Sequence, residues 1–236
     1  MLVLAIDTSA KVSSVALARD KTLLAISTLN TGNTHSETLL SSVNNLLEIS
    51  GVNVSDIDLF AVSNGPGSFT GIRIGVSFVK GIAFGNNKCI GVSTLEALAY
   101  NLADREGVIC AVMDARRNQV YNALFSCQNG ILTRLCDDRL ISLEELDKEL
   151  SAIDEDVFLV GDGYDVALSR LSLDKIKPIS EINRYQNAYS VALCAINSLE
   201  SGKDVQNDQT LLPTYLRAPQ AERERLAKLN NETVTD

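Results

Sequence analysis

Residues 64–84, with the sequence NGPGSFTGIRIGVSFVKGIAF, constrain the fold of this chain more than any other stretch. Residues 64–67 combine glycine and proline and end a preceding apolar run, while Ser68 or Thr70 can cap a helix that we expect to reach about Phe84. The stretch therefore predicts a turn that leads from a buried strand into a helix.

This helix is apolar on two sides. Its polar stripe is narrow and consists of Arg73, Ser77 and Lys80, whereas the two apolar faces contain Ile72, Val76, Val79 and Ala83 on one side and Ile74, Phe78 and Ile82 on the other. Each of the two apolar faces must be buried against other protein surface. We expect the chain's own sheet to cover one face and a partner protein to cover the other, and a wholly internal helix is the alternative.

Three glycines, Gly71, Gly75 and Gly81, lie inside the predicted helix. Each destabilises a helix interior by roughly 0.8 to 1.0 kcal/mol relative to alanine. Close approach of a neighbouring helix is the gain that we expect to offset this loss.

Charge and cysteine content limit the function classes. The chain has 236 residues and a formal net charge of -9, so on its own it lacks the positive charge that dominates nucleic-acid affinity. Any RNA must be held largely by another chain. The five cysteines are odd in number and never spaced C-x-x-C, which argues against a disulfide framework or a thiolate zinc site. Without an export signal or an apolar run of membrane-spanning length, we expect a cytoplasmic protein.

The first part of the chain predicts a mixed α/β unit with the order βββαβαβα. Its expected strands are residues 2–6, 12–18, 22–29, 58–63 and 88–92. The first expected helix begins at Thr34 or Ser36 and ends at Gly51. The second follows the glycine loop, and the third spans residues 94–103.

The second part repeats this order. Its expected strands are residues 108–114, 120–126, 130–136 and 157–160, and its expected helices are residues 142–152, 164–171 and 188–199. Each half opens with a strand that ends in an aspartate, Asp7 or Asp114. We therefore expect a duplicated fold whose domains are residues 1–106 and 107–236.

Four motifs, in order, carry a family resemblance. They are Asp7-Thr8-Ser9, Gly65-Pro66-Gly67-Ser68-Phe69-Thr70-Gly71 with Arg73 and Gly75, Asp114-Ala115-Arg116-Arg117 with Val120-Tyr121, and Pro213-x-Tyr215-Leu216-Arg217. Together they resemble the TsaB (YeaZ) family, densely over residues 2–125 and again over 212–222. The resemblance implies an actin-like ATPase (ribonuclease H-like) fold with two similar βββαβαβα domains and mixed sheets.

The resemblance also implies a role. Members of this family take part in forming threonylcarbamoyladenosine on tRNA as a non-catalytic scaffold that binds and activates the transferase TsaD. The ATPase TsaE joins them, and TsaC makes the threonylcarbamoyl-adenylate donor. The resemblance places ATP and metal on TsaD, with no cofactor required by this chain.

Pairing with TsaD, or with a second copy, is expected through the helices of the first domain. The predicted contact residues are Leu39, Leu40, Val43, Leu47, Phe69, Ile72, Arg73, Val76, Phe78, Val79 and Lys80.

No catalytic residue and no metal site are predicted. The transferase carries two histidines in an H-x-x-x-H metal motif after the strand that corresponds to residues 88–92. Thr94 and Leu98 stand in those places here, and the only histidine, His35, is expected to be a capping or surface residue. Peptidase activity is unsupported, because the chain has no H-E-x-x-H and no G-x-S-x-G motif.

Nucleotide binding is expected to be weak or degenerate. Its candidates are Asp7, Thr8, Asp114 and Arg116, since actin-like kinases keep metal and phosphate contacts where each half begins. Arg116 and Arg117 can equally contact carboxylates of a partner. The loop before Ser68 is no Walker A motif, although its amides can hold an anion.

Two other functions stay open, a stand-alone actin-fold kinase or ATPase for a small molecule, and a self-associating protein outside tRNA modification. At the end of the chain, residues 213–219 are expected to pack back across the first domain. Residues 220–236 are expected to fray or to form a helix that contacts the complex.

Overall fold

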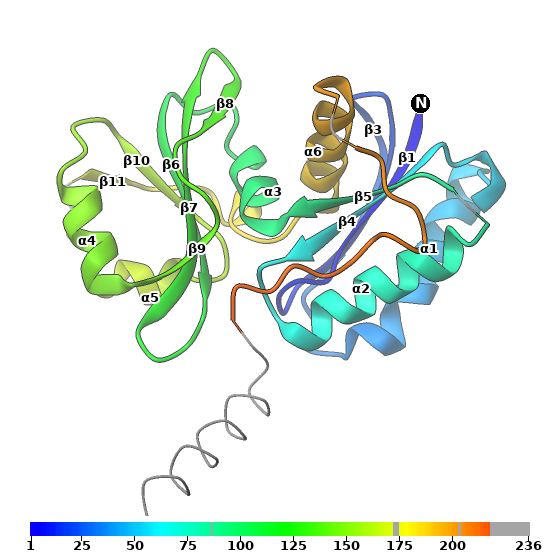
Figure 1. Ribbon diagram of the computed structural model, residues 1–236, viewed down its shortest axis with the longest axis horizontal. Coiled ribbons are helices and arrows are strands. Elements are labelled where there is room, and N and C mark those ends of the chain that lie inside the picture. The colour runs from blue at the N-terminus through cyan, green and yellow to red at the C-terminus, as the bar shows by residue number, and fades with distance from the viewer. Residues whose placement is uncertain (86, 172–174, 203, 218–236) are drawn as a thin grey trace, which may run out of the picture.

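The protein consists of two lobes, each built on a β-sheet, that lie side by side (Figure 1). Its structure is a computed structural model that describes residues 1–85, 87–171, 175–202 and 204–217. The predicted C-terminal tail at residues 220–236 lies outside the described residues. In the part of the chain that is described, no helix has both the length and the apolar content needed to cross a bilayer.

The first lobe contains a five-stranded sheet with the order β3-β2-β1-β4-β5. Its strands are β1 (Leu2–Asp7), β2 (Ser13–Arg19), β3 (Thr22–Leu29), β4 (Leu59–Gly65) and β5 (Cys89–Ser93). β2 is antiparallel to β1 and β3, whereas β1, β4 and β5 are parallel to one another. The predicted meander and the predicted mixed sheet are confirmed.

Two helices, α1 (His35–Ser50) and α2 (Phe69–Ile82), cover one face of this sheet. Thr34 caps α1, and Gly51 ends it with φ 65° in the left-handed region. Ser68 caps α2 by accepting a hydrogen bond from the Gly71 amide at 3.3 Å. These caps agree with the sequence, although α2 ends two residues before Phe84.

The second lobe repeats this plan with a six-stranded sheet. Its order is β11-β10-β6-β7-β8, with β9 also paired to β7. The elements are β6 (Gly107–Asp114), β7 (Gln119–Gln128), β8 (Ile131–Arg134), β9 (Arg139–Ser142), α4 (Leu143–Ser151), β10 (Val157–Val160), α5 (Tyr164–Leu168) and β11 (Ile176–Lys177). β9 and β11 were not predicted, because strands of four and two residues are too short to show periodicity.

The last helix of each repeat packs toward the other lobe. α3 (Thr94–Tyr100) places Leu95 and Leu98 among core side chains of β6 and β7. α6 (Ala188–Glu200) covers the face of the first sheet that α1 and α2 leave bare. Figure 1 shows α6 beside β1 and β3. The packing therefore differs from the predicted division into residues 1–106 and 107–236, because α6 completes the first core.

Residues 204–217 form a segment that we call the strap. It returns from α6 across the first lobe, beginning with the bridge between Gln206 and Cys89. Figure 1 shows the strap passing α2 on its way to the second lobe. The expectation that residues 213–219 pack across the first domain holds for Thr214 and Tyr215, which contact Asn64 and Phe69. Arg217 instead reaches Ala115 of the second lobe, and residues 218 and 219 lie outside the described part.

Candidate functional site

A cleft of about 530 Å³ lies where the two lobes meet. Loops that follow strand ends in both lobes form its walls, which is where ligands bind in open α/β sheets. The polar lining includes Ser9, Lys11, Ser68, Asp114, Arg116, Asp162, Thr214, Tyr215 and Arg217. Of the four predicted nucleotide candidates, Asp114 and Arg116 line this cleft.

Asp7 and Thr8 lie behind the wall of this cleft rather than in its lining. The buried Asp7 carboxylate accepts hydrogen bonds from the Ser9 hydroxyl at 2.6 Å and the Ser63 hydroxyl at 2.7 Å. Burial raises the pKa of Asp7, and these hydrogen bonds oppose that shift. The Thr8 hydroxyl donates to the Gly71 carbonyl at 2.8 Å, so in this structure it serves packing.

Asp114 and Arg116 line the cleft from the second lobe. The Asp114 carboxylate accepts a hydrogen bond from the backbone amide of Arg116 at 2.7 Å, and it lies 3.5 Å from the guanidinium of Arg116. Arg116, Arg117 and Asn118 follow one another with φ of 65°, 57° and 57°. A run of three non-glycine residues in the left-handed region is uncommon. It turns the chain tightly and leaves the Arg116 side chain 86% exposed.

Asp162 is the site residue that the sequence prediction missed. It follows β10 in the run Gly161-Asp162-Gly163, much as Pro66 and Gly67 follow β4. Burial raises the pKa of Asp162 to about 6, a hydrogen bond from Gln186 at 3.2 Å opposes this shift, and the charges of Asp114 and Asp7 add to it. An acidic residue between two glycines at a strand end was the available signal.

Thr94 and Leu98, which the resemblance sets at the positions of the transferase's histidines, are core residues here. Thr94 begins α3, Leu98 lies one turn further along it, and the two residues are 0% and 1% exposed. Across the described residues, no group of three or more histidine, cysteine or acidic side chains is placed to hold a metal ion. His35 is half-buried, and its Nε2 lies 2.7 Å from the Ala10 carbonyl oxygen. Thr34 is the cap, so His35 instead ties α1 to the loop after β1.

The predicted partner-binding residues divide into two groups. Six of them belong to the core of the first lobe and are at most 5% exposed, namely Leu39, Val43, Leu47, Ile72, Val76 and Val79. They face the sheet, so the prediction that they contact a partner needs correction. Leu40 and Arg73 are exposed, while Phe69, Phe78 and Lys80 are half-buried.

The exposed side of α2 is a strip that includes Arg73 and Ser77 of the predicted polar stripe, whereas Lys80 is half-buried. At 3.6 residues per turn, Thr70, Arg73, Ser77 and Gly81 share one face of the helix, and Phe84 continues the same direction just beyond it. All five are exposed, and Phe84 reaches 80%. Ile74, Phe78 and Ile82 form the half-buried border of the strip toward α1. We call Thr70, Arg73, Ser77, Gly81 and Phe84 together the outer strip.

A sheet of the order 3-2-1-4-5, repeated in two lobes around a cleft, defines the actin-like ATPase (ribonuclease H-like) fold. Residues 22–225 match the family model described as "TsaD: tRNA N6-adenosine threonylcarbamoyltransferase". The chain is 31% identical to "tRNA threonylcarbamoyladenosine biosynthesis protein TsaB" of Bacillus subtilis, over 94% of this chain and 96% of that protein. It is 34% identical to the Escherichia coli protein of the same name, over 70% of this chain and 72% of that one.

A solved structure agrees with these relatives. YeaZ from Pseudomonas aeruginosa superposes with a TM-score of 0.78 at 27% identity, and the match covers 91% of this chain and 99% of that one. The chain belongs to the TsaB (YeaZ) family.

Proposed function

We propose that this chain is a non-catalytic subunit of the machinery that makes threonylcarbamoyladenosine on tRNA, and that it binds and activates a TsaD-type transferase. The names of its relatives support the pathway. The match of residues 22–225 to the transferase's own family model supports a partner of the same fold. Two chains of one fold can pair through equivalent helices around an approximate two-fold axis.

The observation that carries this proposal is the outer strip of α2. Phe84 exposes a large apolar surface at the end of the strip, and the strip's border consists of apolar side chains that are only half covered. An exposed phenylalanine beside a row of half-buried apolar side chains is typical of an interaction site. Leu40 on α1, which is 56% exposed, adds to the same apolar character.

Gly81 gives independent support. A Cβ added at Gly81 would meet nothing within 4 Å, so nothing in the described part of this chain requires a glycine there. An exposed glycine inside a helix loses about 1 kcal/mol relative to alanine. Close approach of a partner helix at Gly81 would offset that loss.

The proposal leaves catalysis, ATP and metal to the partner. The chain's single histidine is engaged with a backbone carbonyl, and the buried Asp7 carboxylate is already hydrogen-bonded by its neighbours. TsaE joins the complex in this scheme, and the tRNA is held by the assembly rather than by this acidic chain. Activation requires that docking on α2 favour one state of the transferase over another.

A binding experiment tests the proposal. Phe84→Glu should weaken binding to the purified transferase of the same organism at least tenfold in calorimetry, and should lower the yield of modified tRNA in a reconstituted reaction. Ile182→Glu is the matched control, because Ile182 is 82% exposed and lies between β11 and α6. Equal affinities of Phe84→Glu and the wild type would overturn the assigned surface.

A stand-alone kinase or ATPase for a small molecule is the second candidate. The cleft favours it, because Asp114, Arg116 and Asp162 meet there. Titration of the isolated chain with ATP and magnesium separates the two functions. Micromolar affinity together with phosphate release in the absence of any partner would support the kinase.

A further inference from the structure

The loop between β6 and β7 presents two arginines on a constrained backbone. Residues 116–118 all adopt positive φ, which non-glycine residues rarely do. The Gln119 amide donates to the Arg116 carbonyl at 3.2 Å, and the Ala115 amide donates to the Gln119 carbonyl at 3.1 Å. From the strap, the Arg217 guanidinium donates to the Ala115 carbonyl at 2.8 Å and also contacts the Gln119 side chain. The loop is therefore tied at both ends, and its arginines project from a fixed base.

A third cation lies across the cleft from this loop. Lys11 belongs to the loop after β1 in the first lobe and lines the cleft, as Arg116 does from the second lobe. Arg117 follows Arg116, and all three side chains are exposed. Within the described residues, no carboxylate forms an ion pair with Lys11 or Arg117. We call Lys11, Arg116 and Arg117 the cationic rim.

The carboxylates of the cleft do not cancel this charge. Asp114 is only 24% exposed and is paired with Arg116, while Asp162 is half-buried and accepts a hydrogen bond from Gln186. Arg217 is a further cation of the lining, so three cations face two carboxylates there. The chain as a whole carries 30 acidic and 21 basic residues. The cleft mouth is thus locally positive on an acidic molecule.

The surface beside the rim favours nucleic acid over an acidic protein. Among the exposed large apolar side chains of the described residues, only Tyr215 lines the cleft, and it is 39% exposed. Protein interfaces are depleted in charged residues at their centres, and their anchors are buried apolar or aromatic side chains. RNA is instead held by cations on its phosphates and by bases that stack on accessible aromatic rings.

We propose that the cationic rim contacts backbone phosphates of the substrate tRNA, with Tyr215 beside them, while the transferase holds the rest of the RNA. This inference rests on the proposed function, because the net charge of -9 opposes RNA binding by the isolated chain. Arginine suits this role, since its planar fork of donors matches two phosphate oxygens at once. The fixed loop also limits the conformational entropy lost when the arginines bind.

Titration of an unmodified tRNA transcript into the purified complex of this chain with the transferase of the same organism tests the rim. Arg116→Gln combined with Arg117→Gln should weaken tRNA binding about tenfold. It should also lower the slope of log affinity against log salt by about one to two, because each lost phosphate contact removes up to about one. Lys11→Gln should lower the slope by up to about one.

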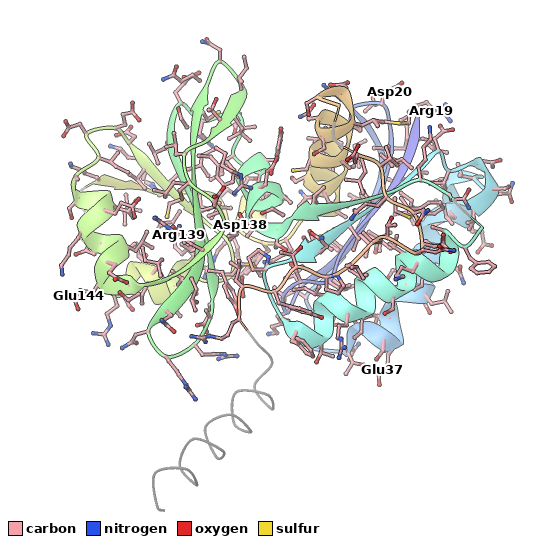
Figure 2. The ribbon with its side chains drawn as sticks, in the orientation of Figure 1. Arg19, Asp20, Glu37, Asp138, Arg139 and Glu144 are labelled. Carbon is pink, nitrogen blue, oxygen red and sulfur yellow. The ribbon has the colours of Figure 1, made fainter. Side chains whose placement is uncertain are left out.

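Arg19→Gln combined with Lys88→Gln is the matched control. It removes the same charge from the edge of the first sheet opposite the cleft, since Arg19 ends β2 beside the start of β1 and Lys88 precedes β5. Figure 2 shows Arg19 on the side of the first lobe away from the second lobe. This control should keep the wild-type affinity and salt slope. Circular dichroism checks folding, and Lys11→Gln, on a separate loop, tests the rim if the double arginine variant does not fold.

The outcomes separate this inference from the proposed function. Failure of the wild-type chain to bind the transferase removes both. A normal complex whose tRNA affinity and salt slope are unchanged in the rim variants would overturn the cationic rim alone. Loss of transferase binding in the rim variants would assign the arginines to carboxylates of the partner protein. Unchanged tRNA affinity with lost affinity for ATP would assign them to a free nucleotide, and either result would also overturn the rim.

Discussion

Gly71 lies against Thr8 so closely that a Cβ added to the glycine would stand 2.0 Å from the Thr8 carbonyl oxygen. The Thr8 hydroxyl in turn donates to the Gly71 carbonyl at 2.8 Å. One turn further along α2, a Cβ on Gly75 would lie 2.4 Å from the Thr8 hydroxyl oxygen. Close approach does explain these two glycines, but the neighbour is the loop after β1 rather than another helix.

The helix glycines should therefore respond in opposite directions to substitution. Gly71→Ala should destabilise the fold by about 1–3 kcal/mol, because the new methyl group forces the loop after β1 to move. Gly81→Ala should raise the free energy of unfolding by up to about 1 kcal/mol, because it meets only open space and improves helix propensity. Urea unfolding of both variants measures the contrast. A loss of stability in Gly81→Ala would contradict this account.

Val76 and Phe84 should separate folding from binding. Val76 is 2% exposed, so Val76→Arg buries a charge in the core and should destabilise the protein by about 4 kcal/mol or more. Phe84→Glu changes an 80% exposed side chain and should stay within about 0.5 kcal/mol of the wild type. Thermal melts of the isolated chain measure both. A well-folded Val76→Arg monomer would mean that this face of α2 is not core.

The stability of the folded protein should fall as the pH rises from about 4 to about 6, because of Asp162. Its folded-state pKa is raised from 3.8 to about 6, so the folded protein binds more protons in this window than the unfolded chain does. This contribution to stability is fully present below the pKa of Asp162 in the unfolded chain, and it is lost as the pH rises through the pKa of Asp162 in the folded protein. The raised pKa of Asp7 acts in the same direction. Asp162→Asn should remove much of this fall, about 3 kcal/mol by the size of the shift.

Chemical unfolding at a series of pH values measures that slope. The exposed Asp104→Asn is the control and should keep the wild-type profile. An unchanged slope in Asp162→Asn would show that Asp162 is ionised without cost in the folded protein.

Arg134 should hold the two lobes together. Its guanidinium donates to Asp138 at 2.6 Å and to Glu96 of α3 at 3.0 Å, and Asp138 also accepts from the Ser93 hydroxyl at 2.6 Å. Figure 2 shows Asp138 on the side of the second lobe that faces the first. Because this half-buried network loses charged hydrogen bonds, Arg134→Met should destabilise the protein by about 2 kcal/mol.

The matched control for Arg134 is Lys148→Met. Lys148 pairs with Glu144 on α4, where the two side chains are 72% and 81% exposed, so solvent screens the pair and its loss should leave the urea midpoint close to that of the wild type. Equal effects of the two substitutions in urea unfolding would show that the network between the lobes contributes nothing beyond a surface ion pair.

Local signals in the sequence predicted most of the elements. The apolar run ending at Asp7, the helix between Thr34 and Gly51, and the strand-turn-helix around Ser68 all carry periodicity and caps that act within a few residues. The duplicated order followed from the same signals. Asp162 was missed because its meaning depends on tertiary pairing: β10 lies parallel to β6 in the second sheet, and loops of the first lobe form the other wall of the cleft that Asp162 lines.

The sequence by itself determined the duplicated α/β order, the family, and the lack of a second histidine beside His35. Only the tertiary structure decided which side of α2 is free, that α6 completes the first core, and that the strap follows α2. The physical reason is that periodicity records how apolar a face is, whereas exposure depends on which distant segment covers it. Val76 and Phe84 are both apolar, but the sheet covers only the first of them.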